Sequence, residues 1–296
     1  MSRPVLVTGS SGFVGAHLLE LLGDEGVPTD VDVTDDSAVA QVVRATRPRA
    51  VVHLAALSWV PESWREPGRV WEVNAVGTVN VLEGVRRECP DARVLAISTG
   101  EVYGRAERVP TPEEAPVAPV SPYAASKAGA EIACAQAREA GVDVVVARPF
   151  GHEGPGRDDR FAVGSWARQL AELELTGGGT LRVGNLDVER DLTDVRDVCR
   201  AYRLLLDPSV PADIYNVATG KTVRMSRVVE LLVGMTRARV TVEPDPERLR
   251  PADIPVLCGD AARLRHATGW RPEIPLEQTL ADTLAAARRA VQVASV

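Results

Sequence analysis

Three glycines at intervals of three residues follow a short apolar run close to the N-terminus. Residues 5–7 have the length and composition of a buried strand, and residues 12–22 carry apolar side chains at helical spacing. Glycines between a strand and a helix let the backbone turn tightly and approach a pyrophosphate, whose charge then faces the unpaired amides of the helix N-terminus. The pattern therefore predicts a strand–turn–helix unit that binds a dinucleotide. The residues assigned to this binding loop are Gly9, Ser11, Gly12, Phe13, Val14 and Gly15.

The rest of the first half repeats this alternation of short apolar segments with longer amphipathic ones. Continuous apolar runs between helices are typical of a parallel sheet that helices cover on both faces. The sequence thus predicts an α/β fold, a Rossmann-like doubly wound parallel sheet. The further strands are expected at residues 31–33, 50–54, 92–98 and 142–147, and the helices at residues 36–45, 70–87 and 122–140.

Glycine and proline cluster at residues 151–156, where the texture of the chain changes. We expect residues 1–150 to form mainly the dinucleotide-binding Rossmann domain and residues 151–296 to form mainly a smaller C-terminal α/β lobe that binds the substrate. The lobe is expected to contain a helix near residues 163–173, a turn-rich stretch at residues 244–255, and two segments that return to the main sheet, residues 191–206 and 214–217.

The composition excludes several classes of protein. A net charge of -7 argues against nucleic-acid binding, which needs concentrated positive charge. The four cysteines show no pairing typical of a zinc site or a disulfide framework, so no metal is expected. No stretch reaches the ~18 apolar residues of a membrane span, and the N-terminus lacks a signal-peptide pattern. We therefore expect a cytoplasmic enzyme with no membrane or nucleic-acid partner.

Tyr123 and Lys127 stand four residues apart near the start of an expected long helix. Residues at this spacing share one helix face, so the ammonium can lie near the phenol and near the ribose of a bound cofactor. A nearby cation favours the phenolate, which predicts a tyrosine pKa below its reference value near 10. The chain contains only two lysines, Lys127 and Lys221, among its 34 basic residues. A lysine in a chain this rich in arginine suggests a position where guanidinium cannot substitute.

A second polar cluster follows the strand expected at residues 92–98. Ser98, Thr99 and Glu101 come at its carboxyl end, the place where open α/β sheets bind ligands. A hydroxyl at this edge can hydrogen-bond a substrate oxygen beside Tyr123. Simple turn chemistry at the end of a strand is the alternative explanation for these residues.

Taken together, these motifs resemble the extended short-chain dehydrogenase/reductase family across nearly the whole chain. The matching strings are TGSSGFVG at 8–15, HLAA at 53–56, NAVGT at 74–78, STGEVYG at 98–104 and SPYAASK at 121–127. The resemblance implies a nicotinamide cofactor, NAD or NADP, a nucleotide-sugar substrate, and a homodimer through two long helices. It also implies Thr99, Tyr123 and Lys127 as catalytic residues, with Glu101 as an additional acid. The further cofactor contacts it implies are Asp32, Val33, Leu54, Ala55, Ala56, Asn74, Ser98 and Pro149.

The C-terminal half narrows the resemblance to GDP-4-keto-6-deoxy-D-mannose reductases and the related GDP-mannose 4,6-dehydratases. The strings RPF at 148–150, GPG at 154–156, VGNL at 183–186, ERD at 189–191 and RPAD at 250–253 carry it. By this resemblance Asn185, Arg190 and Arg250 hold the nucleotide diphosphate of a GDP-linked sugar, because arginine forks match phosphate bidentately. Ion pairs that only stabilise the lobe are the alternative. Substrate contacts are also expected from Thr99, Gly151, Arg157, Val183 and Asp253.

Two positions depart from the family pattern. Gly151 stands where asparagine is usual, and Arg157 stands where glutamine is expected. The segment after the second strand is also abbreviated. An acid closing that strand binds the adenosine ribose in NAD enzymes, whereas arginine there accepts the phosphate of NADP. Asp32 and Val33 match better a segment that lies against adenine, so the preference between NAD and NADP stays open.

The sequence therefore predicts the NAD(P)H-dependent reduction of the C4 ketone of a 4-keto-6-deoxy nucleotide sugar. A 4-epimerase that uses tightly bound NAD has the same three catalytic residues and stays an alternative. A 4,6-dehydratase is less favoured because its large insertions are absent. A non-catalytic nucleotide-binding protein is disfavoured by the intact catalytic residues. The base and the sugar stay open.

Overall fold

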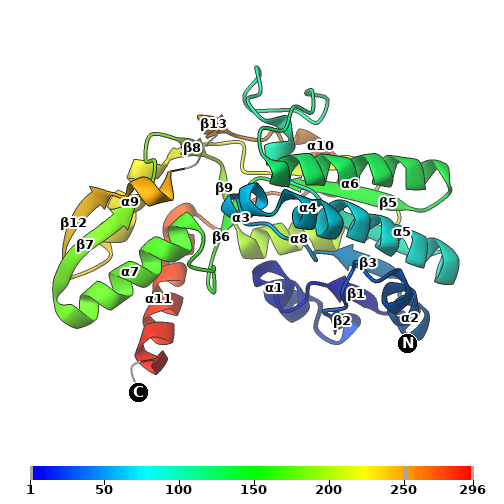
Figure 1. The fold of residues 1–296 in the computed structure, drawn as a ribbon, viewed down its shortest axis with the longest axis horizontal. Helices are drawn as coiled ribbons and strands as arrows, with labels where there is room; N and C mark the ends of the chain where they lie inside the picture. Colours follow the sequence, from blue (N-terminus) through cyan, green and yellow to red (C-terminus); the bar gives the residue numbers. More distant parts are fainter. Residues whose placement is uncertain (1–2, 250–252, 295–296) are drawn as a thin grey trace.

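A six-stranded parallel sheet forms the centre of the molecule in the computed structural model, which describes residues 3–249 and 253–294 (Figure 1). The strand order is β10-β5-β4-β3-β1-β2. Its reversal on either side of β1 and β3 is the doubly wound topology, so the predicted fold class is confirmed. The strands are β1 Val5–Thr8, β2 Gly26–Thr29, β3 Ala50–His53, β4 Arg93–Ile97, β5 Val144–Pro149 and β10 Ile214–Val217.

Helices cover both faces of this sheet because successive strand residues point to opposite sides. On one face the apolar side chains of α1 (Phe13–Leu22) and α8 (Val195–Leu205) pack in a core that includes alternate residues of β1, β3 and β5. On the other face α2 (Asp36–Thr46), α5 (Gly77–Glu88) and α6 (Pro122–Glu139) cover the intervening residues. This two-sided burial explains why the strands read as continuous apolar runs.

The expected strand at residues 31–33 is wrong: β2 ends at Thr29. β2 is an edge strand, which tolerates Pro28, the residue that obscures its pattern. After it the chain turns, and the Asp32 carboxylate accepts hydrogen bonds from the backbone amide (3.0 Å) and the hydroxyl (2.7 Å) of Thr34. Val33 then packs into the core under α2 and α5.

The long helix expected at residues 70–87 is also divided. α4 (Pro67–Trp71) leads into one wide π-helical turn, Glu72–Val76, and α5 continues from Gly77. Such a turn inserts an extra residue into a helix. It surrounds Asn74, whose side chain accepts from the Leu57 amide at 2.8 Å and donates to Ser126 Oγ at 3.0 Å. The wide turn thus ties the loop after β3 to helix α6.

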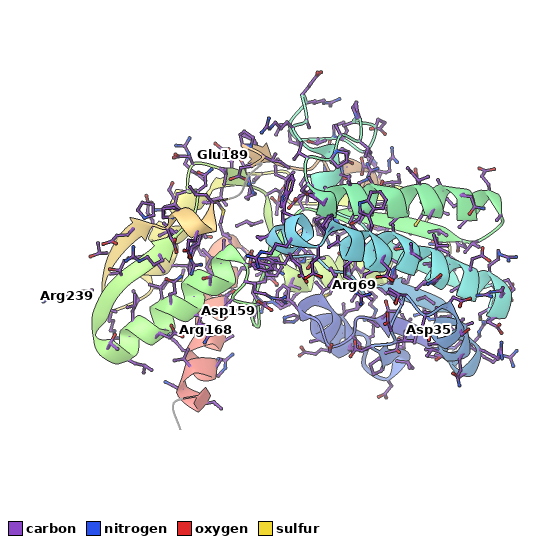
Figure 2. All side chains as sticks on the ribbon, in the orientation of Figure 1. Asp35, Arg69, Asp159, Arg168, Glu189 and Arg239 are labelled. Atoms are coloured by element: carbon purple, nitrogen blue, oxygen red, sulfur yellow. The ribbon has the colours of Figure 1, made fainter. Side chains whose placement is uncertain are left out.

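The C-terminal lobe has its own core. α7 (Ala162–Thr176), α9 (Met225–Gly234) and α11 (Leu276–Ala294) pack around it together with the paired strands β7 (Gly178–Val183) and β12 (Arg239–Pro244). Arg239 of β12 and Glu189 lie on this lobe in Figure 2. The shorter elements are α3 Val60–Arg65, β6 Gly151–Glu153, β8 Glu189–Arg190, β9 Leu192–Asp194, β11 Val223–Arg224, β13 Val256–Leu257 and α10 Ala262–Thr268.

Some segments of the C-terminal half belong to the main sheet, and one short strand connects the sheet to the lobe. α8 and β10 follow part of the lobe in sequence, yet α8 covers one face of the main sheet and β10 extends it beside β5. β6 continues from β5 into the lobe, where it pairs with β9. The carboxyl end of the sheet therefore faces the lobe directly. Within residues 3–249 and 253–294, no helix combines the length and apolar character that crossing a membrane requires.

Candidate active site

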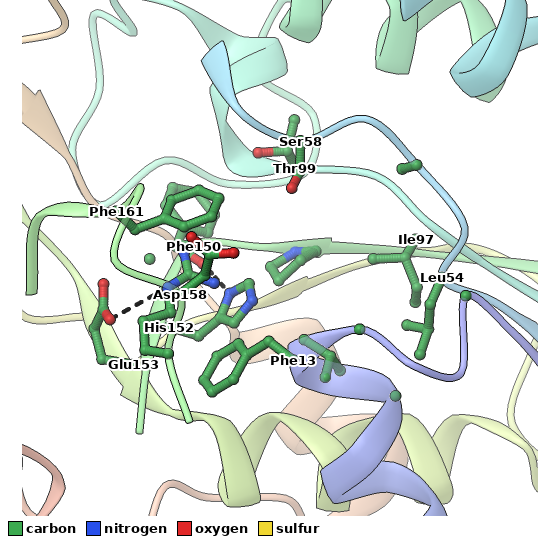
Figure 3. A pocket seen from close by; sticks show the side chains of 18 of the residues that line it. Phe13, Leu54, Ser58, Ile97, Thr99, Phe150, His152, Glu153, Asp158 and Phe161 are labelled. Atoms are coloured by element: carbon green, nitrogen blue, oxygen red, sulfur yellow. Dashed lines mark hydrogen bonds and ion pairs between the residues drawn. The ribbon is translucent and has the colours of Figure 1, made fainter. Parts of the chain in front are cut away.

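A cavity of about 880 Å³ lies between the carboxyl end of the sheet and the lobe. Its wall comes from the loop after β1, the ends of β4 and β5, helix α6, and the first residues of α7 (Figure 3). Because both halves of the molecule contribute, a ligand here contacts the sheet and the lobe together. The predicted residues that line it are Gly9, Ser11, Gly12, Phe13, Val14, Gly15, Leu54, Ala55, Ala56, Ser98, Thr99, Glu101, Tyr123, Lys127, Pro149, Gly151, Arg157 and Arg190.

The glycine loop leaves room for a phosphate close to the backbone. Gly9 has a φ of +65°, and a Cβ there would lie 2.7 Å from the Ala55 amide nitrogen. A Cβ at Gly15 would lie 2.5 Å from the Ser10 carbonyl oxygen, which allows α1 to begin tightly against the loop. Gly12, the N-cap, provides no side-chain cap, and the first turn of α1 holds no acid. The amides at this helix end therefore fit the pyrophosphate of a dinucleotide.

Tyr123 and Thr99 meet inside the cavity. Ser121 caps α6 by accepting from the Ala124 amide, and Pro122 occupies its first turn, so the helix starts with Tyr123 at the sheet edge. The Thr99 side chain hydrogen-bonds to the phenol of Tyr123. Tyr123 is only 9% exposed. A substrate oxygen that enters the cavity therefore meets a hydroxyl and a phenol side by side.

Lys127 lies one helical turn further along α6. Its Nζ donates to the Ile97 carbonyl oxygen at 2.7 Å, which holds the ammonium at the end of β4. Burial lowers the pKa of Lys127 from 10.5 to about 8. The ammonium is thus costly to hold here, which marks the position as a functional candidate.

The expected lowering of the tyrosine pKa is wrong for this structure. Burial, followed by the negative charge of Glu101, raises the pKa of Tyr123 well above 10. Arg157 and the Thr99 hydrogen bond lower it in part. The phenol is consequently protonated at neutral pH.

A buried network of polar side chains lies next to the cavity. Arg148 donates to Glu131 at 2.5 Å and to the Tyr103 hydroxyl at 2.7 Å. Tyr103 in turn donates to Asn216 Oδ1 at 2.8 Å, and Ser98 donates to Glu131. The network joins β4, β5, α6 and β10 at the edge where the cavity opens. Sequence reasoning assigned no role to Glu131, Tyr103 or Asn216, because nothing in their spacing signals a cross-sheet network.

Three of the predicted cofactor contacts lie outside the cavity wall. The side chain of Asp32 turns to Thr34, and Val33 is buried in the core, 3% exposed. Asn74 is fully buried, and its amide group is used by Leu57 and Ser126. These residues shape the surroundings of the site, and the prediction that they bind the cofactor directly is not supported by their positions.

Arg157, one of the two departures from the family pattern, lies between aromatic rings. Its guanidinium is 3.7 Å from the ring centre of Phe161 and 4.9 Å from that of Phe13. Glu153 lies 3.4 Å away, and burial raises the pKa of its carboxyl to about 7. Neither Arg157 Nε nor Glu153 Oε2 has a hydrogen-bond partner. Gly151, the other departure, lies where a Cβ would meet the Asp191 carbonyl oxygen at 2.9 Å.

A second cavity of about 360 Å³ shares six lining residues with the first: Val60, Arg160, Phe161, Ala162, Arg190 and Met225. Arg190 pairs with Asp253 at 2.8 Å, and Asp253 also accepts from Asn185 at 3.0 Å. Val183, by contrast, is buried in the lobe core, 2% exposed, so a direct substrate contact from it is not supported. Arg250 lies outside the described residues. Sequence reasoning missed the other lining residues Trp59, Trp64, Trp166 and Arg248, whose positions depend on loop packing.

The comparisons with known proteins agree with this geometry. The family model described as GDP-mannose 4,6 dehydratase matches residues 27–283. The GDP-6-deoxy-D-mannose reductase of Pseudomonas aeruginosa is 38% identical over 95% of either chain. The GDP-mannose 4,6-dehydratase of Sinorhizobium fredii is 30% identical over 92% of either chain. The solved structure of RMD from Pseudomonas aeruginosa complexed with NADPH has a TM-score of 0.89 at 36% identity, covering 98% of this chain and all of that one.

Proposed function

We propose that this chain, which belongs to the GDP-mannose 4,6 dehydratase family of extended short-chain dehydrogenases/reductases, catalyses the NAD(P)H-dependent reduction of the C4 ketone of a GDP-linked 4-keto-6-deoxy sugar. One observation carries the proposal: Thr99, Tyr123 and Lys127 line the same cavity as the uncapped glycine loop. The 38% identity with a GDP-6-deoxy-D-mannose reductase over almost the whole chain supports the choice of reaction.

Tyr123 is the proton donor in this reaction. A bound nicotinamide supplies the hydride, and the oxygen at C4 must then gain a proton. The raised pKa of Tyr123 keeps its phenol protonated at neutral pH, which is the form that a donor requires. Thr99, hydrogen-bonded to that phenol, can donate its own hydroxyl proton to the same substrate oxygen. The phenol of Tyr123 and the hydroxyl of Thr99 would therefore hold the C4 oxygen in one position.

Lys127 fixes the position of the cofactor ribose and stabilises negative charge that develops on the phenol. With a pKa of about 8, it is mostly an ammonium at neutral pH, so it can donate to ribose hydroxyls while keeping its bond to Ile97. Glu101 acts in the opposite direction, since its carboxylate raises the pKa of Tyr123. The two charges together set how readily the phenol releases its proton.

The second cavity receives the nucleotide part of the substrate. Arg190 and Arg157 provide guanidinium groups near the junction of the two cavities, where a diphosphate joins sugar to base. Asn185 and Asp253 line the second cavity, and their amide and carboxylate groups suit the polar edge of a guanine base. Arg157 and Gly151 alter the sugar side of this site relative to the family pattern.

The three proposed catalytic residues do not by themselves distinguish reduction from epimerisation. A 4-epimerase removes a proton from a sugar hydroxyl and later returns one, and it can use the same phenol for both steps. A dehydratase needs an additional group that acts as acid and base, and Glu101 in the cavity wall could serve as that group. The assay below distinguishes all three.

The test is to incubate the purified protein with GDP-4-keto-6-deoxymannose and to follow NADH and NADPH oxidation separately at 340 nm. We expect oxidation of at least one cofactor and a GDP-6-deoxy sugar as product. Tyr123→Phe should lower kcat at least a hundredfold, whereas Tyr215→Phe, whose hydroxyl only donates to Pro211, is the matched control. If neither NADH nor NADPH is oxidised, the proposed reductase activity is wrong. Interconversion of unreduced sugars without added cofactor would favour the epimerase, and loss of water from GDP-mannose the dehydratase.

We also propose that the protein is a homodimer through the α5–α6 face. Val76 at the end of the π-helical turn, Val79 of α5 and Ile132 of α6 have 50%, 41% and 73% of their surface exposed, and α5 packs beside α6. Apolar side chains gathered on two packed helices favour a symmetric helical interface. Light scattering coupled to size-exclusion chromatography should give twice the chain mass of 31.7 kDa. Ile132→Glu should give monomers, and an unchanged mass for this variant would contradict the assigned face.

A further inference from the structure

Glu153 and Arg157 lie in the wall of the main cavity with polar atoms that make no hydrogen bond. Glu153 ends β6 and is 7% exposed, and Arg157 follows it by four residues. Arg157 Nε and Glu153 Oε2 are 3.4 Å apart, both are buried, and neither has a hydrogen-bond partner among the residues that the structure describes. Buried polar groups without partners are uncommon because each of them costs free energy. The two side chains therefore suit a ligand that supplies one acceptor and one donor.

Packing against aromatic rings holds the guanidinium of Arg157 in place. Its central carbon lies 3.7 Å from the ring centre of Phe161 and 4.9 Å from that of Phe13. Contact with ring faces restricts the guanidinium and leaves its N–H edge available for hydrogen bonds. A side chain that is preorganised in this way loses little conformational entropy when a ligand binds.

Glu153 and Arg157 lie on the side of the cavity that suits the sugar. Arg157 acts electrostatically on the phenol of Tyr123, so it is near the position proposed for the C4 oxygen. Phe161, which contacts Arg157, also lines the second cavity, where the nucleotide is proposed to bind. Figure 3 shows Phe161 and Glu153 on the side of the cavity away from Leu54. This position, near both the reacting carbon and the nucleotide site, is the one that the sugar ring occupies.

A 4-keto-6-deoxy sugar offers few groups to such a site. Its C1 oxygen is bonded to the diphosphate, C4 is the ketone, C5 carries the ring oxygen, and C6 is a methyl group. The hydroxyls that remain are those at C2 and C3, which are neighbours. A hydroxyl can both donate and accept, so one of the two can accept from a guanidinium while the other donates to a carboxyl. The two hydroxyls therefore match Nε of Arg157 and Oε2 of Glu153 in number and in chemistry.

We propose that Glu153 and Arg157 bind the C2 and C3 hydroxyls of the sugar and select substrates that carry both, an inference that rests on the proposed function above. Glu153 accepts from one hydroxyl through Oε2, and Arg157 donates to the other through Nε. The Nη groups of Arg157 remain for the diphosphate. A sugar that lacks either hydroxyl leaves a buried polar atom unpaired, which discriminates strongly against it. Since glutamine is usual at position 157 in the family, the charged contact is a property of this chain.

The test is a calorimetric titration of the protein with GDP-6-deoxymannose and with its 2-deoxy and 3-deoxy analogues, in the presence of NADH and NADPH. These ligands carry no ketone, so binding is measured without reduction. We expect the full sugar to bind at least about tenfold more tightly than either analogue. A protein that shows this preference but does not reduce the 4-keto sugar would contradict the proposed reaction and leave the sugar site intact.

A double variant separates sugar recognition from folding. Glu153→Leu combined with Arg157→Met removes both charges together, which a buried pair tolerates better than the loss of one partner. This variant should bind the three ligands within about threefold of one another. Arg168→Met combined with Glu172→Leu is the matched control, because it removes an exposed pair of the same spacing on α7. The control should keep the preference of the wild type.

Three results would overturn the assignment. The first is a wild type that binds either analogue within about twofold of the full sugar. The second is a double variant that keeps the preference while its melting temperature matches that of the wild type; if the variant is less stable, the titration of the wild type decides. The third is a double variant that keeps the preference but loses affinity for NADH and NADPH in titrations without sugar, which would assign Glu153 and Arg157 to the cofactor.

Discussion

Replacing Lys127 with methionine should stabilise the dinucleotide-free protein while it abolishes catalysis. The lysine is buried, 4% exposed, and burial lowers its pKa from 10.5 to about 8. The folded protein therefore holds an ammonium at neutral pH in a place that disfavours charge. Methionine has a similar length and carries no charge, so it fills the same space without this cost.

The magnitude follows from the pKa difference and the lost hydrogen bond. At about 1.36 kcal/mol for each pH unit, the change from 10.5 to about 8 corresponds to about 3 kcal/mol. Losing the bond from Nζ to the Ile97 carbonyl costs about 1 kcal/mol. We therefore expect Lys127→Met to raise the free energy of unfolding by about 2 kcal/mol at pH 7.

The pH dependence has a definite sign. Because the pKa of this base is lower in the folded protein, the unfolded chain binds more protons between pH 8 and pH 10.5. The cost of the charge is complete below about pH 8 and disappears as the pH rises through 10.5. The advantage of Lys127→Met should therefore be constant from pH 6 to pH 7.5 and shrink above pH 8.

The assay is urea unfolding followed by circular dichroism, with both proteins freed of dinucleotide, at pH values from 6 to 10. Lys221→Met is the matched control, because Lys221 is the other lysine of the chain and is exposed. It should change the free energy of unfolding by less than about 0.5 kcal/mol. A Lys127→Met protein that is less stable than the wild type at pH 7, or an advantage that does not shrink above pH 8, would refute the reasoning.

Three further predictions concern the site and its support. Glu131→Ala leaves Arg148 buried without its partner and should cost about 3–5 kcal/mol in urea unfolding, whereas Glu83→Ala, at an exposed pair, should cost less than about 1 kcal/mol. Gly9→Ala should prevent dinucleotide binding, because its Cβ meets the Ala55 amide nitrogen; calorimetric affinity within twofold of the wild type contradicts this. Since burial raises the pKa of Glu153 to about 7, the wild type should lose stability relative to Glu153→Gln as the pH rises from 4.5 through 7, on the order of 1–3 kcal/mol; a constant difference between their melting curves contradicts the buried charge.

The architecture and the position of the proposed catalytic residues could be predicted from sequence because local spacing determines them. The glycines at 9, 12 and 15 act within one turn, and Tyr123 and Lys127 share a helix face whatever surrounds them. A parallel sheet then brings the end of β4, with Thr99, to the same edge. Each of these steps needs only the local chain and a general rule of α/β folds.

What the sequence could not predict depends on burial and on distant partners. The spacing of Tyr123 and Lys127 suggested a lowered phenol pKa, but burial and the charge of Glu101 raise this pKa. The end of β2 was misplaced because an edge strand with a proline shows little apolar pattern. The predictions that Asn74 contacts the cofactor and that Val183 contacts the substrate rested on the family resemblance alone. In the structure, Asn74 hydrogen-bonds to the Leu57 amide and Val183 packs in the core of the lobe.

The arginines that build the fold differ from the cations of the cavity in how completely their donors are used. Arg93 holds Asp143 and the carbonyl oxygens of Leu205, Asp207 and Val210 at once, which closes the far end of the sheet. At the cavity, Arg157 Nε has no hydrogen-bond partner and lies 3.4 Å from the Glu153 carboxyl, whose pKa is raised, and Lys127 is charged in a buried position. A ligand that offers a partner to these buried polar groups gains binding energy from them, so we expect the cavity to bind anionic and hydroxyl groups.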